Sequence, residues 1–94
     1  MISANQAPWD EFLNRNVVLD MASTYVYVGR LVGERGGYLL LAEADAHDLR
    51  DSNTSREMYV LDCRRHGVRP NRQQVYVDLR HVVGVSALED VVEF

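Results

Sequence analysis

Apolar residues recur at alternate or continuous positions along most of the chain, and this pattern predicts β-strands rather than long helices. Three segments in the first half are rich in β-branched and aromatic residues, namely 17–21, 25–32 and 38–44. The link at 33–37 holds three glycines, which adopt positive φ readily, so residues 25–44 are predicted to form a hairpin. Gly29 interrupts the second strand, and an isolated glycine within a strand usually marks a bend or bulge.

Two further strands are predicted near the C-terminus. Val75, Val77 and Leu79 share one face of a strand that follows a turn at Pro70-Asn71. A tight link at Arg80-His81 leads into a last strand at 82–85, which is rich in valine. The predicted order is therefore a helix, three strands, an inserted helix, two strands and a C-terminal tail.

Residues 8–15 are predicted to form a short N-terminal helix. Pro8 suits the first helical position, and Asp10 and Glu11 suit a first turn, where the helix dipole favours acidic side chains. The spacing of Trp9, Phe12 and Leu13 places all three on one apolar face.

Residues 54–67 depart from the strand pattern. Thr54 and Glu57 have the spacing of a capping box, and Gly67 follows three basic residues as a C-cap would. These signals predict a helix, while a strand through 58–63 remains the alternative. Ser86 and Glu89 form a second possible capping box, which predicts a C-terminal helix.

Length and composition indicate one small globular domain over residues 1–94. A chain of 94 residues buries a modest core, so self-association is a common way to stabilise it. No apolar run approaches a membrane span, and Met1 to Ala7 lack the features of a signal peptide. Cys63 is the only cysteine, so no intrachain disulfide is expected. We therefore expect a cytoplasmic protein.

The distribution of charge is more informative than the net charge of −4. All ten basic residues are arginines, and six of them lie within 23 positions: Arg50, Arg56, Arg64, Arg65, Arg69 and Arg72. This cluster could contact phosphate groups. Alternatively, its arginines compensate the dipole of the 54–67 helix and pair with Asp62, Asp78 or the acids of a neighbouring subunit.

The chain resembles the Sm and Sm-like family in two regions. Gly29-Arg30-Leu31-Val32-Gly33, a turn, and Tyr38-Leu39-Leu40-Leu41 with Glu43 and Asp45 resemble the first Sm motif, within residues 17–46. Val77-Asp78-Leu79 followed by Val82 and Val85 is similar to the second motif, within residues 74–86. The resemblance implies a mainly β fold, a small five-stranded, strongly bent antiparallel barrel of the SH3-like kind with an N-terminal helix. The helix at 54–67 is an insertion before the fourth strand.

The resemblance also implies a ring of six or seven copies, closed by pairing the fourth strand of one subunit with the fifth strand of the next. A valine-rich edge strand presents unpaired backbone groups and favours such head-to-tail pairing. The interface residues expected on this basis are Val75, Val77, Val82, Val83 and Val85. The alternative is a monomer in which the predicted C-terminal helix covers that edge.

Family members that bind uridine-rich RNA use residues that this chain lacks. Gly37 stands in place of the stacking side chain, Leu39 in place of an Asn, and Asp78-Leu79 in place of an Arg-Gly pair. Recognition of uridine in the family's manner is therefore not expected. Any RNA would be bound through other residues: Arg35, Tyr38, Arg80, Arg64, Arg65, Arg69 and Arg72.

No pattern of residues predicts catalysis, a cofactor or a metal ion. Asp45, His47 and Asp48 include potential ligands but lack a second cluster, and a solvated loop is the simpler interpretation. Cys63 and His66 could lie on one helix face, where a buried thiol is again simpler than a reactive one. Two hypotheses remain: an RNA-binding ring, and a homo-oligomeric protein-interaction scaffold without a nucleic-acid role. Neither DNA nor a membrane is expected as a partner.

Overall fold

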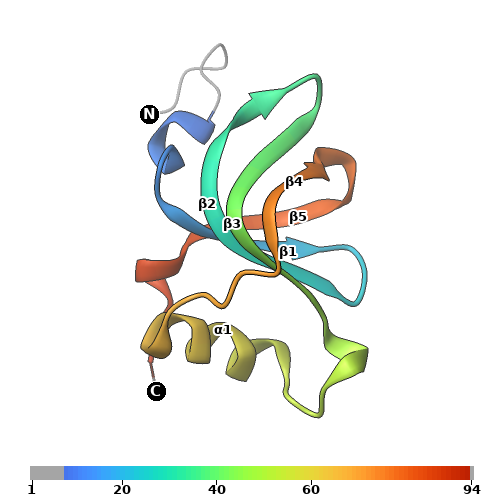
Figure 1. Cartoon of the computed structure of the whole chain (residues 1–94), viewed down its shortest axis with the longest axis vertical. Helices are drawn as coiled ribbons and strands as arrows, with labels where there is room; N and C mark the ends of the chain where they lie inside the picture. Colours follow the sequence, from blue (N-terminus) through green and yellow to red (C-terminus); the bar gives the residue numbers. More distant parts are fainter. Residues whose placement is uncertain (1–7, 94) are drawn as a thin grey trace.

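The computed structural model describes residues 8–93, which form one five-stranded antiparallel sheet and one α-helix (Figure 1). The order in the sheet is β4-β3-β2-β1-β5. The elements are η1 (Pro8–Phe12), β1 (Asn16–Met21), β2 (Tyr25–Arg35), β3 (Tyr38–Asp48), η2 (Leu49–Asp51), α1 (Arg56–His66), β4 (Arg72–Asp78), η3 (Leu79–His81), β5 (Val82–Ala87) and η4 (Leu88–Asp90). This confirms the predicted mainly β fold. The absence of a signal peptide was inferred from residues 1–7, which lie outside the described range.

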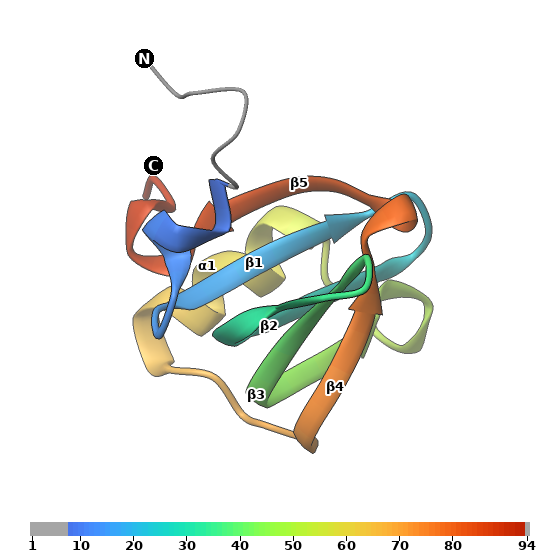
Figure 2. The same cartoon turned by 90° about the horizontal axis from the view of Figure 1, so that it is seen from above.

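The sheet bends sharply near the middle of the paired strands β2 and β3, as Figure 2 shows. The pairing register shifts between Val28 and Arg30, and Glu43 opposite adopts a left-handed φ of 44°. A Cβ on Gly29 would lie 2.7 Å from the Cβ of Ala44, closer than real carbon atoms approach. Gly29 is therefore required by the close approach of the two strands at this irregularity in their register, and the predicted bend is confirmed.

The concave side of the sheet encloses the main hydrophobic core. Its largest fully buried side chains are Leu19, Leu31, Leu39 and Leu41, with Val17 and Val77 beside them. Trp9 and Phe12 of η1 pack against this core from one end, as predicted, whereas Leu13, predicted on the same apolar face, is exposed. Because leucines from β1, β2 and β3 meet in one cluster, the strongly bent sheet is stabilised mainly from within.

A second, smaller core lies on the opposite side of the sheet, beneath α1 (Figure 1). Val18, Val26 and Val28 point away from the first core, and Val60 and Cys63 of α1 cover them. Side chains on a strand alternate between two faces, so β1 and β2 bury both faces only because this helix is present. The inserted segment therefore adds a layer to the barrel.

The helix predicted at 54–67 is confirmed as α1, and the alternative strand through 58–63 is wrong. Ser55, rather than Thr54, is the N-cap, and its hydroxyl accepts a hydrogen bond from the Met58 N–H at 3.2 Å. Gly67 follows the last turn with a φ of 88°, as predicted. The cap is one residue later than expected because Thr54 and Ser55 offer equivalent hydroxyls and only the backbone path selects between them.

Other predicted boundaries need correction. The helix predicted at 8–15 is a single 3₁₀ segment, η1, which is followed by Asn14 at a φ of 63°. The turn predicted at 33–37 is confined to Gly36 and Gly37, because Gly33 pairs with Leu40 in the strand ladder. Leu79 lies in η3 rather than in the strand predicted at 75–79.

The predicted C-terminal helix is wrong. Ser86 belongs to β5 and pairs with Val18, so its hydroxyl does not cap a helix, and η4 has no side-chain cap. Leu88 is buried in the second core, and η4 packs against α1 and β1. The strand continues through Ser86 because pairing with β1 satisfies the backbone there and buries the next residue, Ala87.

Candidate functional site

The turn between β4 and β5 is held by the three residues Asp78-Leu79-Arg80. The carboxylate of Asp78 accepts hydrogen bonds from the Arg80 N–H at 3.0 Å and from Arg80 Nη2 at 2.7 Å. Arg80 Nε lies 3.1 Å from the same carboxylate. These hydrogen bonds from the side chain and backbone of Arg80 lower the pKa of Asp78 to about 2. The side chain of Arg80 is thus folded back on its own turn.

This turn is joined to the turn between β2 and β3. The Leu79 N–H donates to the Gly37 carbonyl at 3.0 Å, and Tyr38 pairs with Asp78 across the sheet. Arg35 pairs with Tyr38 at the end of the hairpin. Three of the residues suggested for RNA binding, Arg35, Tyr38 and Arg80, therefore come together at one corner of the sheet, which we call the Tyr38 corner.

The other arginines suggested for RNA binding lie elsewhere. Arg64 and Arg65 are on α1, which Figure 1 places at the opposite end of the molecule from the β2–β3 turn. Arg69 follows α1 and lines a cavity with Tyr59 and Asp62, and Arg72 begins β4. The sequence cluster at 50–72 is therefore not one surface continuous with the Tyr38 corner.

Most arginines form ion pairs within the chain. The pairs are Arg15 with Glu89, Arg30 with Glu43, Arg50 with Asp48, Arg56 with Asp20, Arg64 and Arg65 with Glu93, and Arg80 with Asp78. Among residues 8–93, no such pair is recorded for Arg35, Arg69 or Arg72. One interpretation of the 50–72 cluster pairs its arginines with Asp62, Asp78 or the acids of a neighbouring subunit. Instead, Glu93 pairs with Arg65 of its own chain at 3.0 Å.

Both outer strands of the sheet have an edge without a strand partner within residues 8–93, since β5 pairs only with β1 and β4 only with β3. Of the valines expected at an interface, Val77 is buried in the first core, while Val75, Val82 and Val85 are half-buried against it. Val83 is 70% exposed. It borders an apolar groove of about 520 Å³ with Trp9, Phe12 and Leu79.

A cleft of about 390 Å³ beside the Tyr38 corner is lined by four of the five tyrosines: Tyr25, Tyr27, Tyr38 and Tyr76. The rings of Tyr25 and Tyr27 stack with centroids 6.0 Å apart, and those of Tyr38 and Tyr76 meet edge to face at 6.5 Å. Burial raises the pKa of the Tyr27 phenol. Their positions in the sequence do not predict this grouping, because it depends on the bend of the sheet.

The residues considered as metal ligands or as a reactive thiol lie near Tyr59 of α1. The Tyr59 hydroxyl donates to Asp45, and the His47 ring stacks on the Tyr59 ring with centroids 4.0 Å apart. No group of three or more His, Cys, Asp or Glu side chains among residues 8–93 is placed to hold a metal ion. Cys63 is buried, as expected, and burial raises the pKa of its thiol.

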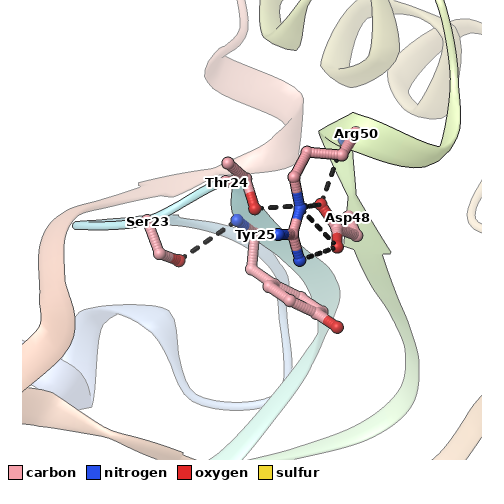
Figure 3. Close-up of polar contacts among 5 residues, drawn as sticks. All are labelled: Ser23, Thr24, Tyr25, Asp48 and Arg50. Carbon is pink, nitrogen blue, oxygen red and sulfur yellow. Dashed lines mark hydrogen bonds and ion pairs between the residues drawn. The ribbon is translucent and has the colours of Figure 1, made fainter.

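A second Asp-Leu-Arg segment, at 48–50, forms the same arrangement between β3 and η2 (Figure 3). We call this arrangement a bracket: the carboxylate of the aspartate binds both the backbone N–H and the guanidinium of the arginine two residues later. Asp48 accepts from the Arg50 N–H at 3.0 Å and from Arg50 Nη2 at 2.7 Å. Thr24 Oγ1 also donates to it at 2.9 Å. The ion pair between Asp48 and Arg50 was not predicted, although the repeated Asp-Leu-Arg triplet is visible in the sequence.

Comparison by sequence finds no match: no family model and no curated protein sequence matches the chain. No helix among residues 8–93 is long and apolar enough to cross a membrane.

Several solved structures are similar to the chain. An Sm-like protein of Archaeoglobus fulgidus matches at a TM-score of 0.60 with 15% identity, over 93% of this chain and 96% of that one. The Sm protein of Pyrococcus abyssii, solved with a uridine heptamer, matches at 0.57 with 17% identity, over 87% and 99%. A chain of the NatC complex bound to CoA matches at 0.56 with 18% identity, over 93% and 92%. With the strand order and the bend at Gly29, these matches show that the chain has an Sm-like fold.

Proposed function

We propose that the chain is a subunit of an oligomeric protein-interaction scaffold, assembled by pairing the β4 edge of one copy with the β5 edge of the next. The observation that carries this proposal is the pair of open edges at the two ends of the sheet, one of them lined by the exposed Val83 and an apolar groove. Such edges favour strand addition, and head-to-tail addition closes into a ring when the rotation per subunit permits. A ring of six or seven copies is the form that the Sm-like fold suggests.

The charges favour a scaffold over an RNA-binding protein. Seven of the ten arginines have a carboxylate partner in the same chain, as the pairs given above show, and the net charge is −4. Affinity for nucleic acid comes largely from cations that contact phosphate, and cations already paired with carboxylates contribute less. A chain of similar fold in the NatC complex is part of a multiprotein assembly. No enzymatic activity is proposed.

Light scattering coupled to size exclusion tests the assembly. We expect a mass of six or seven times the 10.7 kDa of one chain. Val83→Arg places a charge on the β5 edge and should shift the protein toward monomer. Val32→Arg is the matched control, because Val32 is 40% exposed and lies on β2, an inner strand with no open edge. A wild-type protein that stays monomeric at high concentration would refute the proposal.

RNA binding at the Tyr38 corner is the second candidate. It is supported by the convergence of Arg35, Tyr38 and Arg80, since a stacking ring beside two guanidinium groups suits a single strand. Fluorescence anisotropy with oligo-U and oligo-A at two salt concentrations tests it. If the corner binds RNA, Arg35→Ala with Tyr38→Ala abolishes binding and Arg64→Ala with Arg65→Ala leaves it. The absence of binding at low salt removes this candidate.

A further inference from the structure

The inserted helix creates a cavity that the five strands alone would not have. About 280 Å³ of space lies between α1, the outer face of β1, Ser86 of β5 and the tail at Val91 and Val92. Its walls are mainly apolar, with Val18 and Val60 on facing elements. Arg56 and Asp20, whose side chains pair at 3.3 Å, and the hydroxyl of Ser86 supply polar groups. The cavity therefore suits a side chain that is largely apolar and carries one polar atom.

The β5 strand beside this cavity has almost no side chain on its outer face. Gly84 pairs with Asp20, and Ser86 pairs with Val18, so both lie on the face that α1 covers on β1. A Cβ on Gly84 would meet only the side chain of Asp20, at 3.5 Å or more. Gly84 is thus not required by the packing within the chain. An aromatic ring from a neighbouring strand commonly packs over a glycine in such a position.

The opposite edge of the sheet offers such a ring. Tyr76 lies on β4 between Val75 and Val77, which face the first core, so its own side chain points to the outer face. It is 54% exposed, a large fraction for an aromatic residue in a strand. The edge-to-face contact with Tyr38 restrains the ring without covering it.

We infer that Tyr76 of one subunit packs over Gly84 of the next and enters the cavity beneath the α1 helix of that subunit. Pairing β4 with β5 makes one continuous sheet, and paired residues of adjacent strands share a face. Tyr76, Gly84 and Ser86 would therefore lie on the same outer surface across the junction. The phenol ring meets Val18 and Val60, and its hydroxyl reaches the polar groups of Ser86 and Arg56.

This inference rests on the proposed edge-to-edge assembly and gives the inserted helix a role in it. The occupant is a second copy of the chain, because the open β4 edge bearing the ring and the open β5 edge bearing the gap occur in the same molecule. The cavity then selects which chains can pair with the β5 edge. A chain without an aromatic residue at this position of β4 would leave the cavity unfilled and would bind more weakly.

Dilution series followed by light scattering or sedimentation measure the effect. Tyr76→Ala should weaken assembly by about 30-fold in dissociation constant, as the loss of a central aromatic anchor typically does, and Tyr76→Phe should retain most of it. Gly84→Val should weaken assembly from the other side by filling the space over β5. Tyr25→Ala is the control for Tyr76→Ala, since Tyr25 is also an exposed tyrosine but does not lie on β4. Gly33→Val is the control for Gly84→Val, since a Cβ on Gly33 would meet nothing within 4 Å.

A disulfide between subunits provides direct evidence of the contact. The double variant Tyr76→Cys with Ser86→Cys should form covalent ladders under mild oxidation, whereas Tyr25→Cys with Ser86→Cys should not. An assembled wild type in which Tyr76→Ala and Gly84→Val keep full affinity, or in which no ladder forms, overturns the inference while the edge-to-edge assembly stands. A wild type that is monomeric at every concentration refutes the assembly itself and this inference with it.

Discussion

The two Asp-Leu-Arg segments, at 48–50 and 78–80, have the same sequence and almost the same local geometry. In each, the carboxylate caps a short 3₁₀ segment and receives the guanidinium of the arginine two residues later, with Nη2 at 2.7 Å. In each, the leucine N–H donates to the carbonyl of a hairpin turn, Leu49 to Thr24 at 2.9 Å and Leu79 to Gly37 at 3.0 Å. An Asp-Leu-Arg triplet therefore supplies the side-chain hydrogen bonds within its own turn and the backbone hydrogen bond that joins that turn to another at these two places.

The surroundings of the two segments differ. Asp48 is buried and also accepts a hydrogen bond from Thr24 (Figure 3). Asp78 is half-buried and lies at the open Tyr38 corner. A buried carboxylate depends fully on its partners, because water cannot replace them. The same sequence thus forms a structural support between β3 and α1 in one place. In the other it occupies a surface where a partner could bind.

The bracket at 78–80 also lies where the chain departs from the second Sm motif. Asp78 stands where the Sm motif that the chain resembles has an arginine in RNA-binding proteins, and Arg80 lies close by, as the sequence indicates. The structure shows that Arg80 is held by Asp78 rather than presented alone. Its hydrogen bonds to Asp78, the charge of Asp78 and the nearby Tyr38 phenol raise the pKa of the guanidinium. A phosphate group would have to compete with that carboxylate.

The largest expected difference between the two brackets is in stability. Asp48→Ala removes a buried acceptor and leaves the Thr24 hydroxyl and three Arg50 donors without it, so the melting temperature should fall clearly. Asp78→Ala should lower it less, because water can reach the groups that are left. Thermal unfolding followed by circular dichroism checks this. Equal losses for the two variants would show that burial does not distinguish the brackets.

Removing the Thr24 hydroxyl should make the contribution of the 48–50 bracket to stability more similar to that of the 78–80 bracket. Thr24→Val keeps the shape of the side chain but deletes the hydroxyl that donates to Asp48 at 2.9 Å. The free energy of unfolding should decrease by about 1 kcal/mol, the usual contribution of one partly buried hydrogen bond. Urea denaturation measures it. Ser23→Ala, in the same turn, is the control and should cost less because the hydrogen bond that Ser23 Oγ accepts from the Tyr25 N–H is exposed.

The two carboxylates should titrate at different pH. Hydrogen bonds from the side chain and backbone of Arg50 hold the pKa of Asp48 well below its usual range, and Arg80 lowers that of Asp78 to about 2. Because both values are depressed in the folded state, each bracket stabilises the fold above about pH 4, the unfolded value. The contribution of Asp78 is lost as pH falls from about 4 through about 2. Carboxyl carbon shifts measured by NMR should show Asp48 titrating at the lower pH.

The smallest expected effect concerns RNA. If the second candidate function holds, Asp78→Ala releases Arg80 and should raise the affinity for oligo-U a few-fold at low salt, an effect that added salt reduces. Asp48→Ala is the matched variant and should leave the affinity unchanged, because Arg50 is remote from the β2–β3 turn in the pairing of the strands. Anisotropy titrations measure both. An unchanged affinity after Asp78→Ala would indicate that Arg80 does not contact RNA.

The parts of this protein that the sequence predicts are those set by a few adjacent residues. The bend at Gly29, the turn at Gly36-Gly37 and the end of α1 at Gly67 follow from conformations that other residues adopt at a cost. The strands follow from the alternation of side chains. The convergence of Arg35, Tyr38 and Arg80 required the family resemblance in addition, since it depends on two loops that are distant in the sequence.

Other features were decided only by the tertiary structure. Ser86 and Glu89 have the spacing of a capping box, yet pairing with β1 keeps Ser86 in a strand. Glu93 neutralises Arg65 across 28 residues, and four tyrosines from three strands share one cleft. A local pattern acts through hydrogen bonds within one turn or one strand. Which distant side chains meet depends on the register of the strands and on the helix that covers them, and this is set by the packing of the whole chain.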